Sequence, residues 1–554
     1  MQRASDLLSG VSMYAPNNIK IIDCARSAMN ELCKIGLAEN NPVWHQHKEH
    51  RYEILDNIEY LKQFSQVDAS LMELVKMVEV GDLQTLPSFD SCRIQDPMST
   101  KDVFGQGLQI EGSRDMALIK ISPTKLVEVL MDLNQWCTAF HNIVSRAEII
   151  GFFTDGVDGS YNEKMHVMSA EFYLPSPFIP TRECVFARYS KQFTHNIWAV
   201  VDVSLEDILP SFSNNFHKRP SGCLIIGMPN GNSKVIWVEH VVADHSQLNG
   251  LFKTFVTSGL AFGAPRWLAS IVQHIEWSET LNATKLIADA RVLIPQIGRT
   301  SLLKLAERMR RRFCANLSST TNNPWMRLDP VPAGSEDIRV MIGNNMAGIA
   351  SLVFCTTLWL NVSPNRLFNF LRHEKSRSKW DKLSENLAIQ EFACMLTGKH
   401  PENRVSLLSA STSEDKTEIF YLQESYADIT ASYVIYAPLD EPALTSLATG
   451  SSNPDNVVAY PSGFAIIPGG LPRDGDKGKG NANSTANNES LLTMSFHIID
   501  NASNVASIAP ESVQTIYNII TETVAAIKDA VSYHSLLNNW DQDEVANSLA
   551  ALVV

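Results

Sequence analysis

Residues 219–240 read RPSGCLIIGMPNGNSKVIWVEH, and a similar phrase returns as PSGFAII at 461–467 and LLTMSFH at 491–497. In the first copy, two β-branched and apolar runs flank an Asn-Gly pair, which is the pattern of a β-hairpin. In the second copy the strands remain, but their connector is a long Gly-, Asn- and Ser-rich segment without periodicity. This composition predicts a disordered surface loop over 469–490.

The repetition extends over a whole domain. Ser122-Pro123 and Ser363-Pro364 lie 241 positions apart, as do the two Pro-Ser-Gly motifs. In each copy a strand leads into a helix with Ser as N-cap and Pro at its first position, followed by further strands, the hairpin and a long helix (248–275 or 512–534). This order predicts an α+β fold of two tandem helix-grip domains, each a curved antiparallel sheet around a long C-terminal helix, usually with a cavity between them.

The length of 554 residues also favours two cores, since a single core rarely organises so long a chain. We assign 16–285 to the first domain and 326–545 to the second. Between them, 286–325 is expected to hold a linking basic amphipathic helix and a linker.

Composition excludes several classes of protein. The net charge of -14 opposes phosphate backbones, and no apolar run is long enough for a signal peptide or a membrane span. The nine cysteines are scattered without a CxxC pair, and the three histidines of HQHKEH (45–50) have a spacing that spreads them around a helix. No catalytic motif is present. We therefore expect no enzyme activity, no metal and no cofactor other than a bound lipid or sterol.

One basic cluster stands out in LLKLAERMRRRFC (302–314), where apolar residues recur at helical spacing. Two interpretations remain open. The arginines form the solvated face of an interdomain helix, or they form a nuclear-import or partner-binding patch. The residues concerned are Arg308, Arg310, Arg311 and Arg312.

Several segments of the first copy closely resemble the START lipid-binding domain of plant class IV homeodomain-leucine zipper transcription factors. They include AEFYLPSPFIPTRECVFARYSKQ (170–192), MPNGNSKVIWVEH (228–240) and SGLAFGAPRW (258–267), and the resemblance continues through PSGFAII into the START-associated region. It implies a transcriptional regulator, nuclear or alternatively cytoplasmic, that binds a hydrophobic lipid and other transcriptional regulators. Family members carry a homeodomain and a zipper before START, which this chain lacks. We therefore expect no direct sequence-specific DNA binding from it.

Polar residues that face the first cavity are the candidates for ligand recognition. Arg188 resembles the inward-facing cationic position of START domains and would hold a polar group of a ligand or an internal acid; otherwise it is a surface or salt-bridged arginine. Alternation puts Trp237 and Glu239 on one face of their strand and Val238 and His240 on the other. Glu239 is expected to pair with Arg182 or Arg188, and Glu171 is a weaker candidate for that pairing. Phe252, Phe255, Phe262 and Trp267 would wall the cavity.

The repeat serves as an internal control. At aligned positions Arg188 becomes Leu422 and Glu239 becomes Phe496, whereas His240 is matched by His497. The second copy has lost the polar pair, so a polar ligand is assigned to the first domain. The shared histidine favours a structural role.

Three functional hypotheses follow. The first is a lipid- or sterol-binding regulatory module whose ligand tunes stability or partner binding. The second is a non-enzymatic protein-interaction scaffold with a side-chain-filled cavity, which large inward-pointing side chains would favour. The third is that the sequence is a truncated form of a DNA-binding member of the family.

Overall fold

The chain divides into two compact units, one made of residues 1–174 and 178–275 and the other of residues 175–177 and 276–554. The division falls within one helix, α9 (Ala264–Asn282). The computed structural model describes residues 15–37, 42–47, 50–64, 108–157, 159–205, 208–209, 216–248, 250–283, 294–320, 323–328, 337–344, 350–382, 387–411, 418–469, 489–501, 503 and 508–534. The loop predicted over 469–490 lies almost entirely outside these residues.

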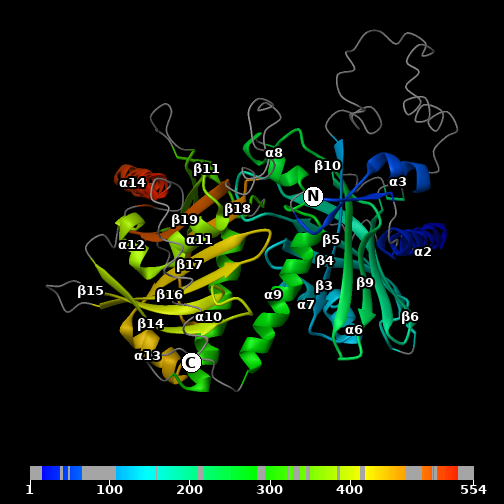
Figure 1. Ribbon diagram of the computed structural model, residues 1–554, viewed down its shortest axis with the longest axis horizontal. Helices are drawn as coiled ribbons and strands as arrows, with labels where there is room; N and C mark the ends of the chain where they lie inside the picture. Colours follow the sequence, from blue (N-terminus) through cyan, green and yellow to red (C-terminus); the bar gives the residue numbers. More distant parts are fainter. Residues whose placement is uncertain are drawn as a thin grey trace, which may run out of the picture. The chain divides into compact units, whose positions relative to one another are not determined.

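The first unit is an antiparallel sheet with helices on both faces (Figure 1). Within the described residues, the strand order is β1-β2-β3-β10-β9-β7-β6-β5-β4, and β8 pairs with β10. Its elements are α2 (Ala15–Leu37), β1 (Trp44–Gln46), β2 (Glu53–Leu55), α3 (Asn57–Phe64), β3 (Leu108–Ile119), α6 (Pro123–Met131), α7 (Leu133–Ala139), β4 (Val144–Asp155), β5 (Lys164–Phe172), β6 (Arg182–Thr194), β7 (Ile197–Ser204), β8 (Phe216–Lys218), β9 (Ser221–Gly227), β10 (Ser233–Asp244), α8 (Gly250–Thr257) and α9.

The second unit repeats this topology with its own elements. Its described strands follow the order β11-β12-β13-β19-β18-β17-β16-β15-β14, which matches the first sheet strand by strand. The elements are α10 (Gln296–Asn316), β11 (Met326–Arg327), β12 (Arg339–Asn344), β13 (Ala350–Leu360), α11 (Pro364–Arg372), α12 (Glu374–Trp380), β14 (Ala388–Leu396), β15 (Arg404–Ser411), β16 (Glu418–Ala427), β17 (Ser432–Leu439), α13 (Glu441–Thr449), the short 3-10 helix η3 (Pro454–Asn456), β18 (Ser462–Pro468), β19 (Ser490–Asp500) and α14 (Pro510–His534). The predicted pair of helix-grip domains is confirmed.

The two predicted Ser-Pro helix starts are also confirmed, because α6 begins at Pro123 and α11 at Pro364. Two other expectations differ from the structure. The closing helix of the first copy is interrupted, since residues 258–263 separate α8 from α9, whereas α14 is continuous. The basic helix α10 was assigned to a linker, but it belongs to the second unit, where it packs on β16, β17 and α13.

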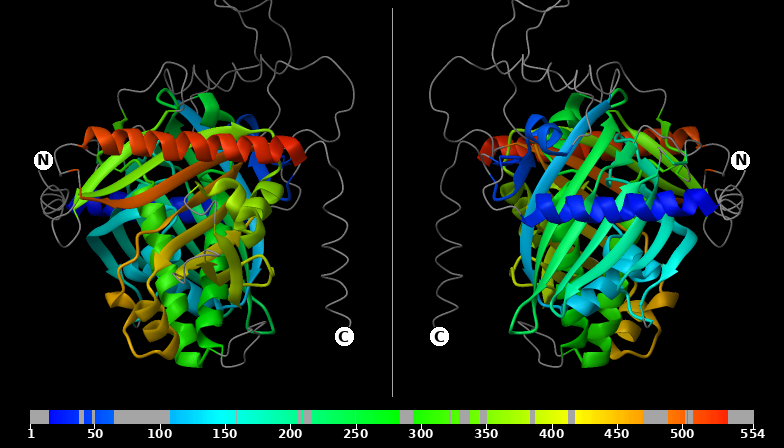
Figure 2. Two further views of the ribbon diagram at one scale, coloured as in Figure 1. Left: turned by 90° about the vertical axis from the view of Figure 1, so that its left-hand side faces the viewer. Right: turned by 90° about the vertical axis from the view of Figure 1, so that its right-hand side faces the viewer.

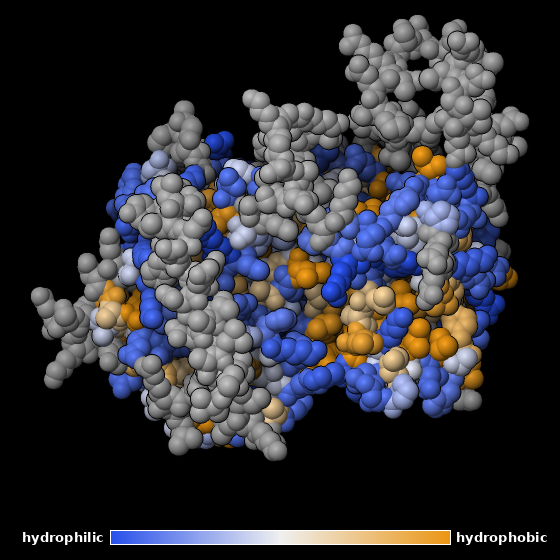
Figure 3. Space-filling view, viewed as in Figure 1, coloured by the Kyte–Doolittle hydropathy of each residue, from blue (hydrophilic) through white to orange (hydrophobic). Residues whose placement is uncertain are grey.

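In the first unit, α2 covers one face of the sheet, which we call the outer face. Figure 2 shows this helix crossing the strands, and its apolar stripe packs on residues such as Val201, Leu224 and Val238. The opposite, inner face carries α6, α7 and α9. Apolar side chains also reach the surface of the first unit, as the orange areas over its strands show in Figure 3, and Met116 and Leu118 of β3 are 62% and 67% exposed.

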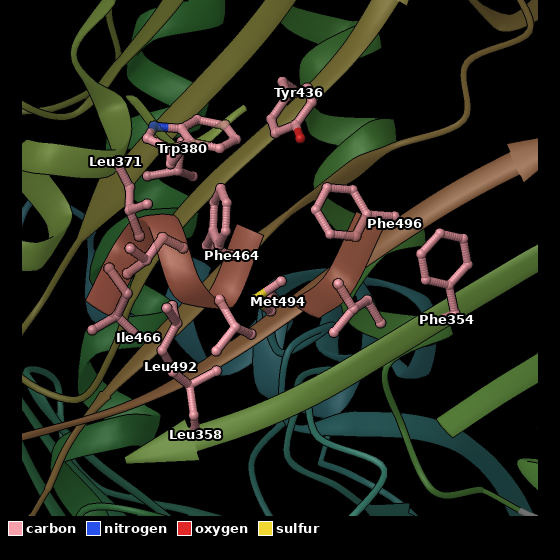
Figure 4. Packing of buried hydrophobic residues seen from close by; sticks show 14 of the residues in the cluster. Phe354, Leu358, Leu371, Trp380, Tyr436, Phe464, Ile466, Leu492, Met494 and Phe496 are labelled. Carbon is pink, nitrogen blue, oxygen red and sulfur yellow. The ribbon is translucent and has the colours of Figure 1, made fainter. Parts of the chain in front are cut away.

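The core of the second unit contains a large apolar cluster. Trp380 of α12 meets the ring of Phe464 edge-on at 4.9 Å between centroids, and Phe354 lies beside Phe496 at 5.7 Å (Figure 4). Ile516 and Ile520 of α14 belong to the same buried cluster. This packing follows from the alternation of β13 and β19, whose inward positions are apolar.

The repeated Pro-Ser-Gly motif has a backbone reason. Gly222 and Gly463 have φ of +139° and +158°, and a Cβ built on them would lie 2.0 Å from the carbonyl oxygen of Val200 and 2.2 Å from that of Val434, respectively. The preceding serine hydroxyl bonds to the strand that carries the shared histidine: the Ser221 Oγ accepts from the His240 N–H, and the Ser462 Oγ accepts from the His497 N–H. Each motif thus holds its strand, β9 or β18, close to the two adjacent strands of the sheet.

We predict that Gly222→Ala destabilises the first unit by about 3 kcal/mol, because the new methyl group would overlap a backbone carbonyl that cannot move away. Gly231→Ala is the matched control, since Gly231 also has a positive φ but open space around it; it should cost about 1 kcal/mol. Urea unfolding of both variants measures the difference. Equal losses would show that the close approach at Gly222 is not the constraint.

Candidate functional site

Arg188 of β6 occupies the inner face of the first sheet and is only 4% exposed. Its Nε and Nη2 donate to the two carboxylate oxygens of Asp202 on β7, at 2.7 and 2.8 Å. Its Nη1 donates to the Leu130 carbonyl oxygen at 2.8 Å, and the guanidinium carbon lies 4.2 Å from the ring centroid of Trp136. The inward cation that the sequence predicts is therefore bonded to an internal acid.

A second buried ion pair continues from Asp202. The Lys218 Nζ lies 2.5 Å from Glu239 Oε1 and 3.9 Å from Asp202 Oδ2. Burial lowers the pKa of Lys218, but Glu239 and Asp202 outweigh this effect and raise the pKa above its usual value. The expected pairing of Glu239 with Arg182 or Arg188 is wrong, because its partner is Lys218 of the short strand β8. We call the series Arg188–Asp202–Lys218–Glu239 the charge ladder.

Arg182 forms a separate cluster with Glu111 of β3. Its Nη1 donates to Glu111 Oε2 at 2.9 Å, and the His245 Nε2 lies 2.6 Å from Glu111 Oε1. Burial alone would raise the pKa of Glu111, but Arg182 and His245 bring it down to about 2, so the carboxylate stays ionised. The Arg182 guanidinium carbon also lies 4.0 Å from the ring centroid of Phe262.

A small cavity of about 80 Å³ lies beside the carboxylates of Glu111 and Glu239. Its wall combines inner-face residues of β3 and β10 with the turn 258–263 that joins α8 to α9. Two bonds hold this turn: the Tyr52 hydroxyl donates to the Ser258 carbonyl oxygen at 2.7 Å, and the Ala264 N–H donates to Ser113 Oγ at 2.9 Å. The lining residues are Ile54, Leu55, Asn57, Ile110, Glu111, Gly112, Ser113, Glu239, Val241, Thr257, Ser258, Gly259, Phe262 and Gly263.

Next to the charge ladder, large aromatic side chains fill the interior. Trp267 of α9 stacks on Trp237 of β10 with 5.4 Å between ring centroids, and it lies 4.9 Å from Phe140 and 6.2 Å from Trp136. All four are nearly fully buried. Trp237 and Trp267 thus face inward, as the sequence predicts, and they pack against each other.

The remaining predicted site residues have varied surroundings. Glu171 is buried, but it accepts from the Ser145 hydroxyl at 2.7 Å and lies 3.4 Å from Arg146, so it takes no part in the charge ladder. Phe252 stacks on Phe178, and Phe255 is fully buried.

His240 lies on the opposite face of β10 from Glu239, as alternation predicts. Its ring meets that of Tyr60 edge-on at 4.4 Å between centroids. Within the described part of the chain, neither ring nitrogen has a hydrogen-bond partner. Burial, with a smaller contribution from Arg219, lowers the pKa of His240 to about 3, so the ring is neutral near pH 7.

A comparison of the two sheets shows that the residue aligned with Arg188 in the sequence repeat is wrong by one position. Arg188 pairs with Asp202 across β6 and β7, and the equivalent cross-strand pair in the second sheet is Gln423 with Tyr436. Leu422 therefore points to the outer face and is not the counterpart of Arg188. A one-residue shift reverses the face of every side chain on a strand, and spacing alone did not fix it.

In the second unit the cation comes from a helix. Arg377 of α12 aligns with Trp136 of α7; its Nε donates to Asp381 at 3.0 Å, and its guanidinium carbon lies 4.0 Å from the ring centroid of Tyr436. In the first unit the cation lies on a strand and the aromatic ring on a helix, whereas in the second unit the cation lies on a helix and the ring on a strand. The positions of Glu239 and Ser113 are taken by Phe496 and Phe354, which are paired in the same way.

The basic cluster of α10 is largely engaged inside the second unit. Arg310 is buried, with its Nη1 2.7 Å from Glu424 Oε1, while Arg308 and Arg312 donate to carbonyl oxygens of Asp455 and Ala459. Arg311, whose side chain is 43% exposed, and Arg312 are exposed, and Arg308 is half-buried. A solvated face is therefore wrong for Arg310, which is buried, and nuclear import stays a prediction.

Sequence reasoning missed Asp202, Lys218 and Glu111. Asp202 is the one charge in the apolar strand β7, which was an available signal, whereas β3 and β8 carry several polar residues and gave no such signal for Glu111 and Lys218. The histidines of HQHKEH lie on and beside β1, not on a helix, and no cluster of metal ligands occurs among the described residues. None of the described helices combines the length and hydropathy that crossing a membrane requires.

Comparison with known proteins gives two domain matches and several relatives. Residues 91–278 match the START domain, and residues 296–533 match the PDF2-like, C-terminal domain. The chain is 33% identical to homeobox-leucine zipper protein HDG1 of Arabidopsis thaliana over 92% of its length, and 36% identical to HDG3 of the same plant over 76%. It is 34% identical to ROC4 of Oryza sativa subsp. japonica over 84%. The chain spans about 60% of the length of these relatives.

We predict that Arg188→Leu lowers the stability of the first unit by about 4 kcal/mol, because Asp202 would remain buried beside Lys218 without its bidentate partner. The double variant Arg188→Leu/Asp202→Leu should recover at least half of that loss. Urea unfolding of both variants tests the coupling. A fully stable Arg188→Leu protein would contradict a structural role for this pair.

We predict that acid destabilises the first unit partly through His240. The unfolded chain binds a proton below about pH 6.5, whereas the folded ring does so only near pH 3, so this contribution to stability is lost as the pH falls between these values. His240→Phe keeps the ring against Tyr60 and should flatten the pH dependence of the unfolding free energy from pH 6.5 to 4. The exposed His195→Phe is the control and should leave the slope unchanged.

Proposed function

Because the chain belongs to the class IV homeodomain-leucine zipper family through its START and PDF2-like C-terminal domains, we propose that it is a non-enzymatic module of a transcriptional regulator whose first unit binds a hydrophobic lipid or sterol. Ligand binding then tunes the stability of the first unit or its contacts with other transcriptional regulators. The module acts in the nucleus.

The observation that carries this proposal is the cavity beside Glu111 and Glu239. Its wall is apolar on one side, with Leu55, Val241 and Phe262, and polar on the other, which is the combination that small-molecule sites use. At about 80 Å³ it holds only a polar head and a few carbons. Binding of a whole lipid therefore requires the turn 258–263 and α8 to move outward.

Among the predicted ligand-binding residues, Glu239 and Phe262 line this cavity. Arg182 binds the lining carboxylate of Glu111, whereas Arg188 binds Asp202, which does not line the cavity. Trp237 and Trp267 pack against each other outside the lining. Phe252 and Phe255 belong to the helix that would move. Glu171 is left with a structural role.

A second function is favoured by the stacking of Trp267 on Trp237 and on Trp136. Aromatic rings already occupy the interior there, which suits a protein-interaction scaffold whose cavity is filled by its own side chains. In that case the chain would act only through its surface, and no lipid would be required for its stability.

The deciding experiment is native and lipid mass spectrometry of the full chain purified gently from a plant or insect host. We expect a stoichiometric lipid on the wild-type protein and its loss from Phe262→Trp, because the larger side chain fills the cavity. Phe178→Trp, which lies outside the cavity lining, is the control. A folded wild-type protein without any lipid would favour the scaffold.

A further inference from the structure

The outer face of the first sheet is only partly covered by the described helices. Along β10, four side chains point to this face in the order His240, Val238, Ile236 and Lys234. Tyr60 of α3 packs on His240, and α2 lies on Val238, where a Cβ built on Gly36 would be 3.8 Å from the valine side chain. On the side of α2 away from α3, the strands continue without a covering helix in the right-hand view of Figure 2.

The uncovered area is mainly apolar, and we call it the open strip. Its first row pairs Met116 of β3 with Ile236 of β10. Its second row crosses the sheet through Leu118, Lys234, Ile226 and Ile197. Met116 and Leu118 are 62% and 67% exposed, and the three isoleucines are half-buried. Apolar side chains that gather at the surface of a protein in this way mark a site where another molecule binds.

The dimensions of the open strip suit one α-helix. Its second row crosses β3, β10, β9 and β7 and reaches Thr194 of β6. Five strands about 4.8 Å apart span about 19 Å, which is the length of about 13 helical residues. Two residues along a strand cover about 7 Å, and packed helices lie about 8–10 Å apart. A helix packed beside α2 would therefore lie along the second row.

The open strip is basic, although the chain as a whole has a net charge of -14. Lys234 stands in its second row, and Lys191 flanks it on β6, where the Nζ lies 5.3 Å from the ring centroid of Phe193. Within the described part of the chain, neither lysine has an ion-pair partner, and no aspartate or glutamate belongs to the strip. This surface complements a partner that carries carboxylates beside apolar side chains.

The second unit has different residues at the equivalent positions. The cross-strand pair Ile226–Lys234 corresponds to Ile467–Leu491, and both residues of the second pair are only 1% exposed. The fold therefore accepts an apolar residue at the position of Lys234 and does not require the charge. In the first unit this position reaches solvent and carries a cation, which a binding partner can use.

From these observations we propose that the open strip docks an amphipathic α-helix of a partner protein, about 13 residues long and lying alongside α2. The apolar side of this helix covers Met116, Leu118 and Ile226, and its carboxylates lie opposite Lys234 and Lys191. The inference goes beyond the proposed lipid-binding function and does not rest on it, because none of these residues lines the cavity of the first unit.

The test uses two fluorescein-labelled synthetic peptides of about 14 residues, both with leucines at helical spacing (i, i+3, i+4, i+7). One peptide has glutamates on both sides of the leucine stripe, and the other has lysines. Fluorescence anisotropy measures their binding to the full chain. We expect the acidic peptide to bind at least tenfold more tightly, because only its charges complement the strip. Equal affinities overturn the charge complementarity, and binding of neither peptide overturns the docking site.

Two variants assign the binding to the open strip. Leu118→Asp should weaken the acidic peptide at least tenfold, and Lys234→Glu should reverse the preference in favour of the basic peptide. Both side chains reach solvent, so the variants should keep the wild-type circular dichroism spectrum. Val458→Asp and Lys304→Glu change exposed residues of the second unit and are the controls that should bind as the wild type does. Unchanged binding by Leu118→Asp overturns the proposal.

The same variant distinguishes other occupants of the strip. A wild-type dimer in analytical ultracentrifugation that Leu118→Asp abolishes would assign the strip to a second copy of the chain. Binding to phosphatidylserine vesicles that the variant abolishes would assign it to a lipid bilayer. Either result overturns the partner helix. Lipid mass spectrometry of Leu118→Asp should match the wild type, so a failure of the docking site is separate from a failure of lipid binding.

Discussion

The bidentate bond between Arg188 and Asp202 is the interaction around which the interior of the first unit is arranged. It joins β6 to β7, and through the Leu130 carbonyl and the Trp136 ring it also ties both strands to α6 and α7. Two charges can be buried in this way only because each satisfies the other and further donors and acceptors complete the set. Lys218 lies between Asp202 and Glu239, at 3.9 Å and 2.5 Å, and so extends the ionic network to β10.

The second unit also places an arginine between a helix and its sheet, but with different partners. Arg377 enters from α12 and lies on aromatic rings of the sheet, whereas in the first unit the arginine lies on the strand and the ring on the helix. At the positions of Ser113, Glu239 and Glu111, the second unit has the apolar residues Phe354, Phe496 and Leu352. Duplication therefore preserved the backbone scheme, including the Pro-Ser-Gly contact, and let the interiors diverge.

This divergence bears on function. A buried ionic network is weak evidence for stability, because well-packed apolar residues often do as well or better, and the second unit demonstrates such a solution. The first unit has carboxylates of Glu111 and Glu239 in a cavity wall, at positions where the second unit has Leu352 and Phe496. A cavity with polar groups in its wall agrees with the lipid-binding role proposed for the START domain.

The sequence by itself determined the duplication, the two helix-grip folds and the opposite faces of Glu239 and His240, because spacing, turn residues and alternation are local properties that one-dimensional order expresses. Tertiary structure alone decided the partners of the buried charges. Lys218 and Glu111 meet Glu239 and Arg182 through strands far apart in the sequence, and no periodicity encodes which cation lies nearest to which acid. It also decided that α10 buries Arg310 against Glu424 and that Gln423, not Leu422, faces the second core, since both depend on register and packing that form only when the sheet closes.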